Sequence, residues 1–315
     1  MKNNKNKQIH GSFIGVCLAI IMMMMPVHGA SYFMITDLGS SAEMIRKGNI
    51  EGFSAGANSV FENPAGLYRV NTLSTSVFAT TIMKEVNYRN VSLAFKSSIG
   101  VIAVGYMDAG VDDIITTTMD SNKNVVANGT FSYKNRVIKV GYQNTVTDQL
   151  HWGVNAVGYM NELHTYSGTG YNIDAGLIYL LSNLEVSLFA RNLIPMQVTY
   201  SDSEDKTYSG KEDMPLQTIL SLGYGWGDLD MMGQFKYDGV NTLIGAGLDY
   251  TPGFLWDALT LSVGYKEFSV LDSTDNTMTF GVGLNLFGLS LDYAYEKSDH
   301  FEYDANNFAS VGIDF

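Results

Sequence analysis

The chain has 315 residues, a formal net charge of −13, 46% hydrophobic residues and a single cysteine. A strongly acidic chain is a poor candidate for binding nucleic acid, because phosphate recognition needs basic patches. One cysteine cannot supply a disulfide framework, so the fold must be held together in another way. A large sheet with its backbone hydrogen bonds satisfied would serve.

Residues 1–30 have the layout of a cleaved secretory signal peptide. Three lysines precede the apolar run FIGVCLAIIMMMM at 13–25, and Gly29 and Ala30 are small enough for a cleavage site. Cys17 lies near the beginning of the apolar run rather than at its end, which argues against a lipoprotein. Cleavage removes three lysines and no acidic residue, so the mature chain would carry a charge of −16 and no cysteine.

Residues 31–71 do not alternate between apolar and polar positions. The stretch 41–47 could form a short helix, whereas the glycines that follow suggest loop. Within SVFENPAGLY, the pair Asn63 and Pro64 predicts the start of a turn, because proline fixes φ and disfavours helical geometry in the residue before it. On local sequence alone, a plain surface turn is the alternative.

From residue 72 onward the chain alternates with period two, as strands with one apolar face do. In LEVSLFAR, for example, apolar residues on one face oppose Glu185, Ser187 and Arg191 on the other. No later segment has the roughly 20 consecutive apolar residues of a membrane-spanning helix. Fourteen strands are predicted, at 72–82, 85–97, 99–107, 130–145, 149–161, 169–181, 184–192, 215–225, 229–237, 241–250, 258–267, 276–286, 288–296 and 306–315.

Alternation alone fits both a soluble sandwich, with apolar faces packed together, and a membrane barrel, with apolar faces toward lipid. The even number of strands and the alternation of short and long connections favour the barrel. Long connections are predicted at 108–129, 193–214, 268–275 and 297–305. The prediction is therefore an all-β fold, a 14-stranded antiparallel transmembrane barrel at 72–315 in contact with outer-membrane lipid.

The predicted long connections are rich in acidic residues. With their flanking residues and the connection near 162–168, they carry seventeen acids and four lysines, more than half of the 32 acids of the chain. Solvated loops explain this composition. A surface that binds divalent cations or a partner protein is the alternative.

The chain ends in the strand pattern NFASVGIDF, with Phe315 as its last residue. A terminal phenylalanine that closes such a strand resembles the signal recognised by the barrel assembly machinery of bacterial outer membranes. This pattern adds to the case for a barrel.

Irregular backbone at membrane depth is tolerated only inside protein or a water-filled lumen, so residues 31–71 are predicted to form a plug, or hatch, inside the barrel. Asn63, Pro64, Ala65 and Gly66 would make its turn against the wall. The glycines predicted to give the plug room are Gly245, Gly247, Gly281 and Gly283. Charged residues predicted to face the lumen are Asp174, Glu185, Arg191, Lys236, Asp249, Lys266 and Asp292. Unpaired charges there would be costly, so we expect them to pair within the wall or with the plug.

The motif NSVFENPAGL resembles the Asn-Pro-Ala signature of the hatch in FadL-like outer-membrane proteins. The stretches FARNLIP (189–195), MPLQTILSLGY (214–224) and 289–315 resemble strands of the PorV/PorQ (UPF0164-like) branch. The resemblance implies fourteen strands and a plug. Classical members carry fatty acids and other hydrophobic molecules, whereas PorV-like members serve a protein secretion machine.

An enzyme is not expected. No G-x-S-x-G elbow occurs, and His151, His164 and His300 have no spacing typical of a metal site or a catalytic triad. No cofactor or metal is predicted. The leading hypothesis is an outer-membrane channel for passive uptake of hydrophobic or amphipathic small molecules. The alternative is a PorV-like docking or shuttle component of a secretion system, with secretion-system proteins as partners, and a soluble β-protein is the third reading.

Overall fold

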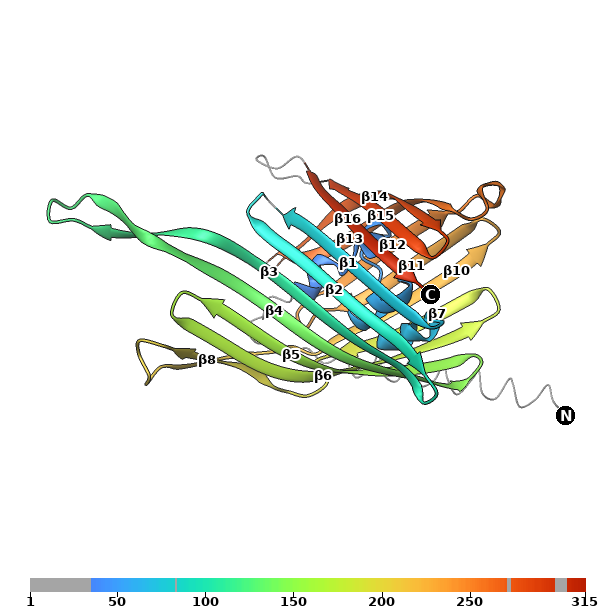
Figure 1. Cartoon of the computed structure of the whole chain (residues 1–315), viewed down its shortest axis with the longest axis horizontal. Helices are drawn as coiled ribbons and strands as arrows, with labels where there is room; N and C mark the ends of the chain where they lie inside the picture. Colours follow the sequence, from blue (N-terminus) through green and yellow to red (C-terminus); the bar gives the residue numbers. More distant parts are fainter. Residues whose placement is uncertain (1–34, 83, 271–272, 298–304) are drawn as a thin grey trace.

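The computed structural model describes residues 35–82, 84–270, 273–297 and 305–315, which form a closed antiparallel β-barrel with short helices inside it (Figure 1). The predicted signal peptide, 1–30, lies outside the described residues and stays a prediction. Across the described residues, no helix is both long enough and apolar enough to cross a membrane.

Fourteen of the described strands form the wall, which confirms the predicted fold class. Each wall strand pairs with the next along the chain, except that β7 pairs with β10, and β1 pairs with β16 to close the barrel. The wall strands are β1 (Leu73–Ile82), β2 (Val86–Ser97), β3 (Gly100–Met119), β4 (Val125–Thr147), β5 (Leu150–Leu163), β6 (Tyr166–Leu181), β7 (Leu184–Arg191), β10 (Gln217–Trp226), β11 (Leu229–Tyr237), β12 (Thr242–Tyr250), β13 (Leu259–Val270), β14 (Ser273–Leu286), β15 (Leu289–Lys297) and β16 (Ala305–Asp314).

The two ends of the barrel differ. One end, which we call the turn end, carries the two-residue connections at 98–99, 148–149, 182–183, 227–228 and 287–288. It also carries the 3-10 helix η4 (Gly253–Leu255). The other end, which we call the loop end, carries extended hairpins that project past the barrel (Figure 1).

The prediction of a long loop at 108–129 is wrong. β3 and β4 continue through it and pair as far as Met119 and Val125, with bulges after Val111 and Ile115. The residues are rich in threonine, isoleucine and valine, which favour extended backbone. Beyond the pair Val111↔Tyr133 these strands pair only with each other, and they form a two-stranded arm, residues 112–132, at the loop end (Figure 1).

The predicted loop at 193–214 also contains strands that the sequence analysis missed, β8 (Gln197–Asp202) and β9 (Ser209–Asp213). β8 pairs with the outer part of β6, and β9 pairs with β8. Val198 and Met214 are buried in the core, so this hairpin is part of the fold. Each strand is only five or six residues long, which leaves a weak periodic signal.

The wall exposes its apolar face. Leu261 on β13, Leu291 on β15 and Val311 on β16 are 45%, 40% and 44% exposed, whereas Ser262 and Ser310 on the opposite faces are buried. A soluble sandwich has the reverse arrangement, with apolar faces buried. An outward apolar band with polar residues inside is typical of a membrane barrel.

The segment 35–71, which we call the plug, lies inside the barrel (Figure 1). It contains η1 (Ile35–Leu38), α2 (Ala42–Arg46), η2 (Gly56–Val60) and η3 (Pro64–Arg69). α2 occupies the stretch where a short helix is predicted, and the Ser41 hydroxyl caps it by accepting a hydrogen bond from the Met44 N–H at 3.2 Å. Apolar plug residues such as Ile35 and Phe61 join wall residues such as Phe78, Tyr88 and Phe308 in one buried cluster.

Candidate functional site

The Asn-Pro-Ala turn joins the plug to the wall. Asn63 caps η3, because its side-chain oxygen accepts a hydrogen bond from the Ala65 N–H at 3.0 Å, and Pro64 opens the helix. The Asn63 amide also donates to the Ser187 hydroxyl at 2.9 Å and to the Leu188 carbonyl at 3.2 Å, both on β7. One side chain therefore shapes the turn and attaches it to the wall.

Wall glycines make room for this turn. A Cβ atom on Gly176 would lie 1.9 Å from the Asn63 side-chain oxygen, and one on Gly153 would lie 2.4 Å from the Pro64 carbonyl carbon. Within the turn itself, a Cβ on Gly66 would lie 2.9 Å from the Ser59 hydroxyl. The backbone of the plug therefore lies directly against the sheet at this point.

The four glycines predicted to give the plug room lie near α2. A Cβ on Gly281 would lie 2.4 Å from the Arg46 Cβ, and one on Gly247 would lie 2.5 Å from the Lys47 carbonyl oxygen. A Cβ on Gly283 would lie 3.1 Å from the Arg46 guanidinium, whereas Gly245 would keep ordinary contact distances. The second approach of the plug to the wall is therefore through α2.

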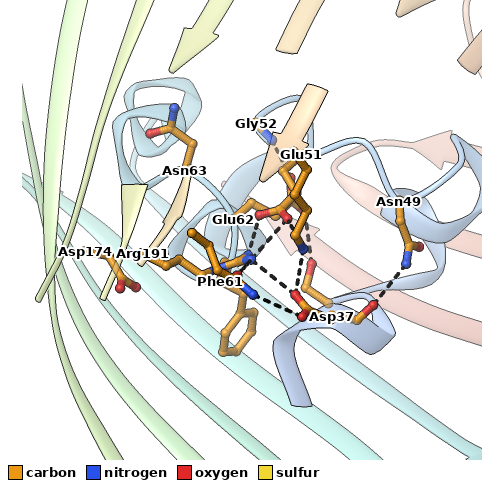
Figure 2. Close-up of polar contacts among 12 residues, drawn as sticks. Asp37, Asn49, Glu51, Gly52, Phe61, Glu62, Asn63, Asp174 and Arg191 are labelled. Carbon is orange, nitrogen blue, oxygen red and sulfur yellow. Dashed lines mark hydrogen bonds and ion pairs between the residues drawn. The ribbon is translucent and has the colours of Figure 1, made fainter. Parts of the chain in front are cut away.

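Charged side chains bridge the plug and the wall in two clusters. In the first, wall cations meet plug carboxylates (Figure 2). Arg191 on β7 donates to Glu51, with one contact at 3.1 Å, and lies 3.6 Å from Asp37. Lys236 on β11 donates to Asp37 at 2.6 Å and to Glu51 at 3.2 Å. Two positive and two negative charges therefore balance in the lumen.

In the second cluster the signs are reversed. Arg46 of α2 donates to Asp249 at 3.0 Å and to Asp292 at 3.2 Å, and it also contacts Ser262. Lys47 pairs with Glu43 of the plug at 2.8 Å. Wall carboxylates thus hold plug cations here, and the clusters together link the plug to β7, β11, β12 and β15. We call the two clusters the plug–wall lock.

The remaining predicted lumen charges are also paired. Asp174 and Lys139 form an ion pair of 2.7 Å inside the wall, with both side chains fully buried, and Lys139 also donates to the Phe61 carbonyl of the plug at 3.3 Å. Glu185 pairs with Arg69 of the plug. Lys266 on β13 pairs with Glu296 on β15 at 2.5 Å, across the intervening strand β14.

The sequence analysis named most of the wall residues of this arrangement and none of its charged plug residues. The missed plug residues are Asp37, Glu43, Arg46, Lys47, Glu51, Glu62 and Arg69, and the wall residues Lys139 and Glu296 were not predicted either. The plug has no periodic pattern that would say which way a side chain points. The signal available in the sequence was the number of charged residues in the plug segment, where they lie among small and apolar residues.

Glu62 is a buried plug carboxyl without a cationic partner in the described part of the chain. Its oxygens accept hydrogen bonds from the Ser40 hydroxyl at 3.0 Å, the Gly52 N–H at 3.0 Å and the Ser54 N–H at 3.4 Å. Burial raises the pKa of the Glu62 carboxyl to about 7. The plug therefore contains one acid that changes its charge near neutral pH.

The described ranges contain no group of three or more His, Cys, Asp or Glu side chains that could hold a metal ion.

Phe315, the proposed assembly signal, is 67% exposed, and its backbone pairs with Leu73 on β1. Its role in assembly stays a prediction, as does the absence of enzymatic activity.

Comparison with known proteins identifies a family and a fold. Residues 124–310 match the model of the family described as type IX secretion system membrane protein PorP/SprF. No curated protein matches the chain significantly. The match begins in the arm, so the plug lies outside it.

Among solved structures, the chain is similar to the toluene transporter TodX of Pseudomonas putida, at 12% identity over 88% of this chain and 99% of that one, with a TM-score of 0.58. It is also similar to the monoaromatic hydrocarbon channel CymD, at 11% identity over 88% and 98% of the chains, with a TM-score of 0.60. These similarities show the FadL-like barrel fold that the sequence predicted. The finer prediction of the PorV/PorQ branch stays a prediction.

Proposed function

The chain belongs to the PorP/SprF family of type IX secretion system membrane proteins, and from that premise we propose that it is an outer-membrane component of such a system. In this proposal the barrel is a closed scaffold on which other proteins of the system assemble. The loop end faces the outside of the cell and the turn end faces the periplasm, as in barrels with short periplasmic turns.

The plug–wall lock is the observation that carries the scaffold role. Arg191 and Glu51 are each 1% exposed at the side chain, and the Arg46 cluster is nearly as deeply buried. Removing one partner of such a buried pair costs about 3 to 5 kcal/mol. Moving the plug aside would break pairs in both clusters together, which favours a permanently closed lumen.

A closed scaffold binds its partners through surfaces outside the lumen. The arm offers Ile115, Met119 and Val125 at 63%, 76% and 66% exposure. Exposed apolar residues on a projecting ribbon are costly in water and are typical of contact surfaces. The arm is therefore the first surface to test.

The test uses cells that run a type IX system and lack this chain. We expect secreted cargo to accumulate in the periplasm, and the wild-type chain to restore secretion. Replacing residues 115–130 by Asn-Gly, a tight hairpin turn between the paired residues Ile114 and Phe131, should leave the barrel intact and lower secretion. Replacing the exposed β8–β9 tip, 203–208, by Asn-Gly is the control, and it shortens the connection beyond the pair Ser201↔Ser209. Unchanged secretion in cells without the chain refutes the proposed role.

Deleting the whole segment 193–214 would be a poorer test. That deletion would remove Val198 and Met214 from the core and would damage the barrel whatever its function. The tip at 203–208 is exposed and connects β8 to β9 without joining the core.

A hydrophobic-uptake channel is the second candidate. The fold shared with TodX and CymD favours it, together with an apolar lumen cluster that includes Phe78, Tyr88, Met107 and Phe308. Its test is the uptake of a long-chain hydrophobic fluorescent probe by vesicles that contain the purified protein. Uptake no faster than in empty vesicles rejects the channel and leaves the scaffold proposal standing.

A further inference from the structure

A charged hollow of about 300 Å³ lies on the outer face of the wall, across β2, β3 and β4. Arg89, Asp108, Lys134 and Arg136 are among its lining residues. Residues next to each of them along the strands, such as Tyr88, Met107 and Val137, are buried inside the barrel. Because side chains alternate across a strand, the lining residues point away from the lumen.

The position of the hollow relative to the apolar face follows from strand register. One row across β2, β3 and β4 consists of Val91, Tyr106 and Ile138, which are 47%, 37% and 40% exposed. The next row toward the loop end consists of Arg89, Asp108 and Arg136. The outer surface therefore changes from apolar to charged within two residues along each strand, at the edge of the band that meets lipid.

The cations in the hollow are not equivalent. Arg136 is held by Glu162 on β5, at 3.0 and 3.2 Å, and by Asp108 at 3.4 Å. Arg89 and Lys134 have no ion-pair partner among the residues that the structure describes. Cationic side chains that face lipid are destabilising by an amount that grows with depth, so a bound anion there would relieve a cost.

Carboxylates in the hollow limit what the anion can be. Asp108 is engaged by Arg136, and the exposed Asp112 lines the hollow farther along β3 toward the loop end. Three cations and two carboxylates line the hollow, so the net charge of its lining is +1. The whole chain, in contrast, carries a net charge of −13. A small anion held between Arg89 and Lys134 fits this balance, whereas a long acidic segment would meet Asp112 and Glu162.

We propose that Arg89 and Lys134 bind the phosphate of a phosphorylated glycolipid in the leaflet at the loop end. The acyl chains of that lipid would lie along the apolar rows below, over Val91 and Val104, with Tyr106 at the boundary. This site is independent of the lumen and of the secretion role. It makes the face of β2–β4 a fixed point of contact with the membrane at the base of the arm.

The experiment is native mass spectrometry of the purified full-length protein, titrated with bisphosphorylated lipid A. Arg89→Gln/Lys134→Gln is the test variant, and Lys206→Gln/Lys211→Gln, on the β8–β9 hairpin, is the charge-matched control. Loss of two charge-assisted hydrogen bonds should weaken lipid binding at least tenfold in the test variant and leave the control unchanged. The charge-conserving variant Arg89→Lys/Lys134→Arg should retain binding. Comparing the electrophoretic mobility of unheated and heated samples checks that every variant remains a folded barrel.

Two further titrations identify the source of the phosphate. Dephosphorylated lipid A should bind the wild type at least tenfold more weakly, and inorganic phosphate should neither bind measurably nor displace lipid A at millimolar concentration. Equal binding of the dephosphorylated lipid, or equal binding by the test variant and the wild type, overturns the site. Displacement by inorganic phosphate overturns the lipid assignment.

Discussion

Glu51 is the plug carboxylate at which two wall cations meet, and replacing it by glutamine tests whether charge holds the plug. Glutamine keeps the size of the side chain, so the change is mainly electrostatic. In the variant, Arg191 and Lys236 face Asp37 alone, and the cluster gains one uncompensated positive charge. Asp37 is 33% exposed at its side chain, so Glu51, at 1%, is the cleaner target.

The expected cost of Glu51→Gln is about 3 to 5 kcal/mol in the free energy of unfolding, the usual effect of breaking a buried pair. Adding Lys236→Gln restores the balance, because Arg191 and Asp37 remain as one pair. The double variant should therefore lose clearly less than the sum of the two single variants, with an interaction energy of about 1 to 3 kcal/mol.

Two assays check this prediction. Urea unfolding of the detergent-solubilised barrel gives the free energies, and planar-bilayer recording shows whether a loosened plug lets ions through. We expect brief conductance steps in Glu51→Gln that are rarer in the double variant. Costs below about 1 kcal/mol for each single variant, or strictly additive costs, would refute the idea that the plug is held by a balanced ion-pair cluster.

Three further predictions concern the plug. Asn63→Ala removes the cap of η3 and the bonds to β7, so unfolding should become easier by about 2 to 3 kcal/mol, against less than about 0.5 kcal/mol for the exposed control Asn128→Ala; equal effects would contradict the anchoring role. Gly176→Ala should cost about 1 to 3 kcal/mol in the same urea assay because of the clash with Asn63, whereas Gly158→Ala, where a Cβ meets nothing within 4 Å, should be nearly neutral. Because the Glu62 pKa rises to about 7 on folding, stability from this group is highest below about pH 4.5 and falls by about 3 kcal/mol as pH rises to about 7; urea unfolding between pH 4 and 8 should show that decline in the wild type relative to Glu62→Gln, and parallel curves would contradict it.

The barrel was predictable because its signal is repeated. Each wall strand alternates strictly enough that a slip of one residue would reverse its lipid and lumen faces. The prediction of a long connection at 268–275 is also wrong, because β13 and β14 pair as far as Val270 and Ser273. The three errors, at 108–129, 193–214 and 268–275, arose where both faces of a ribbon are exposed or the strands are short. In those places polar and apolar residues no longer have to alternate, so the extended arm resembles a loop.

The residues of the candidate sites also differ in whether the sequence alone could predict them. The inward charges, such as Asp249 and Arg191, could be found from strand parity alone. Their plug partners, such as Arg46 and Glu51, could not, because side-chain direction in irregular backbone depends on where the segment packs. The hollow at Arg89 and Lys134 was also missed, since it needs the register of three strands to bring its residues into adjacent rows.

By itself the sequence determined the number of wall strands, the face that each turns toward lipid, and the position of a turn at Asn63. These properties are local or periodic, so they follow from residue order and elementary backbone geometry. Only the tertiary structure decided which plug charge meets which wall charge, that the arm is a ribbon, and where the outer wall changes from apolar to cationic. Those properties depend on contacts between segments as far apart as Arg46 and Asp292, which only closure of the barrel around the plug brings together.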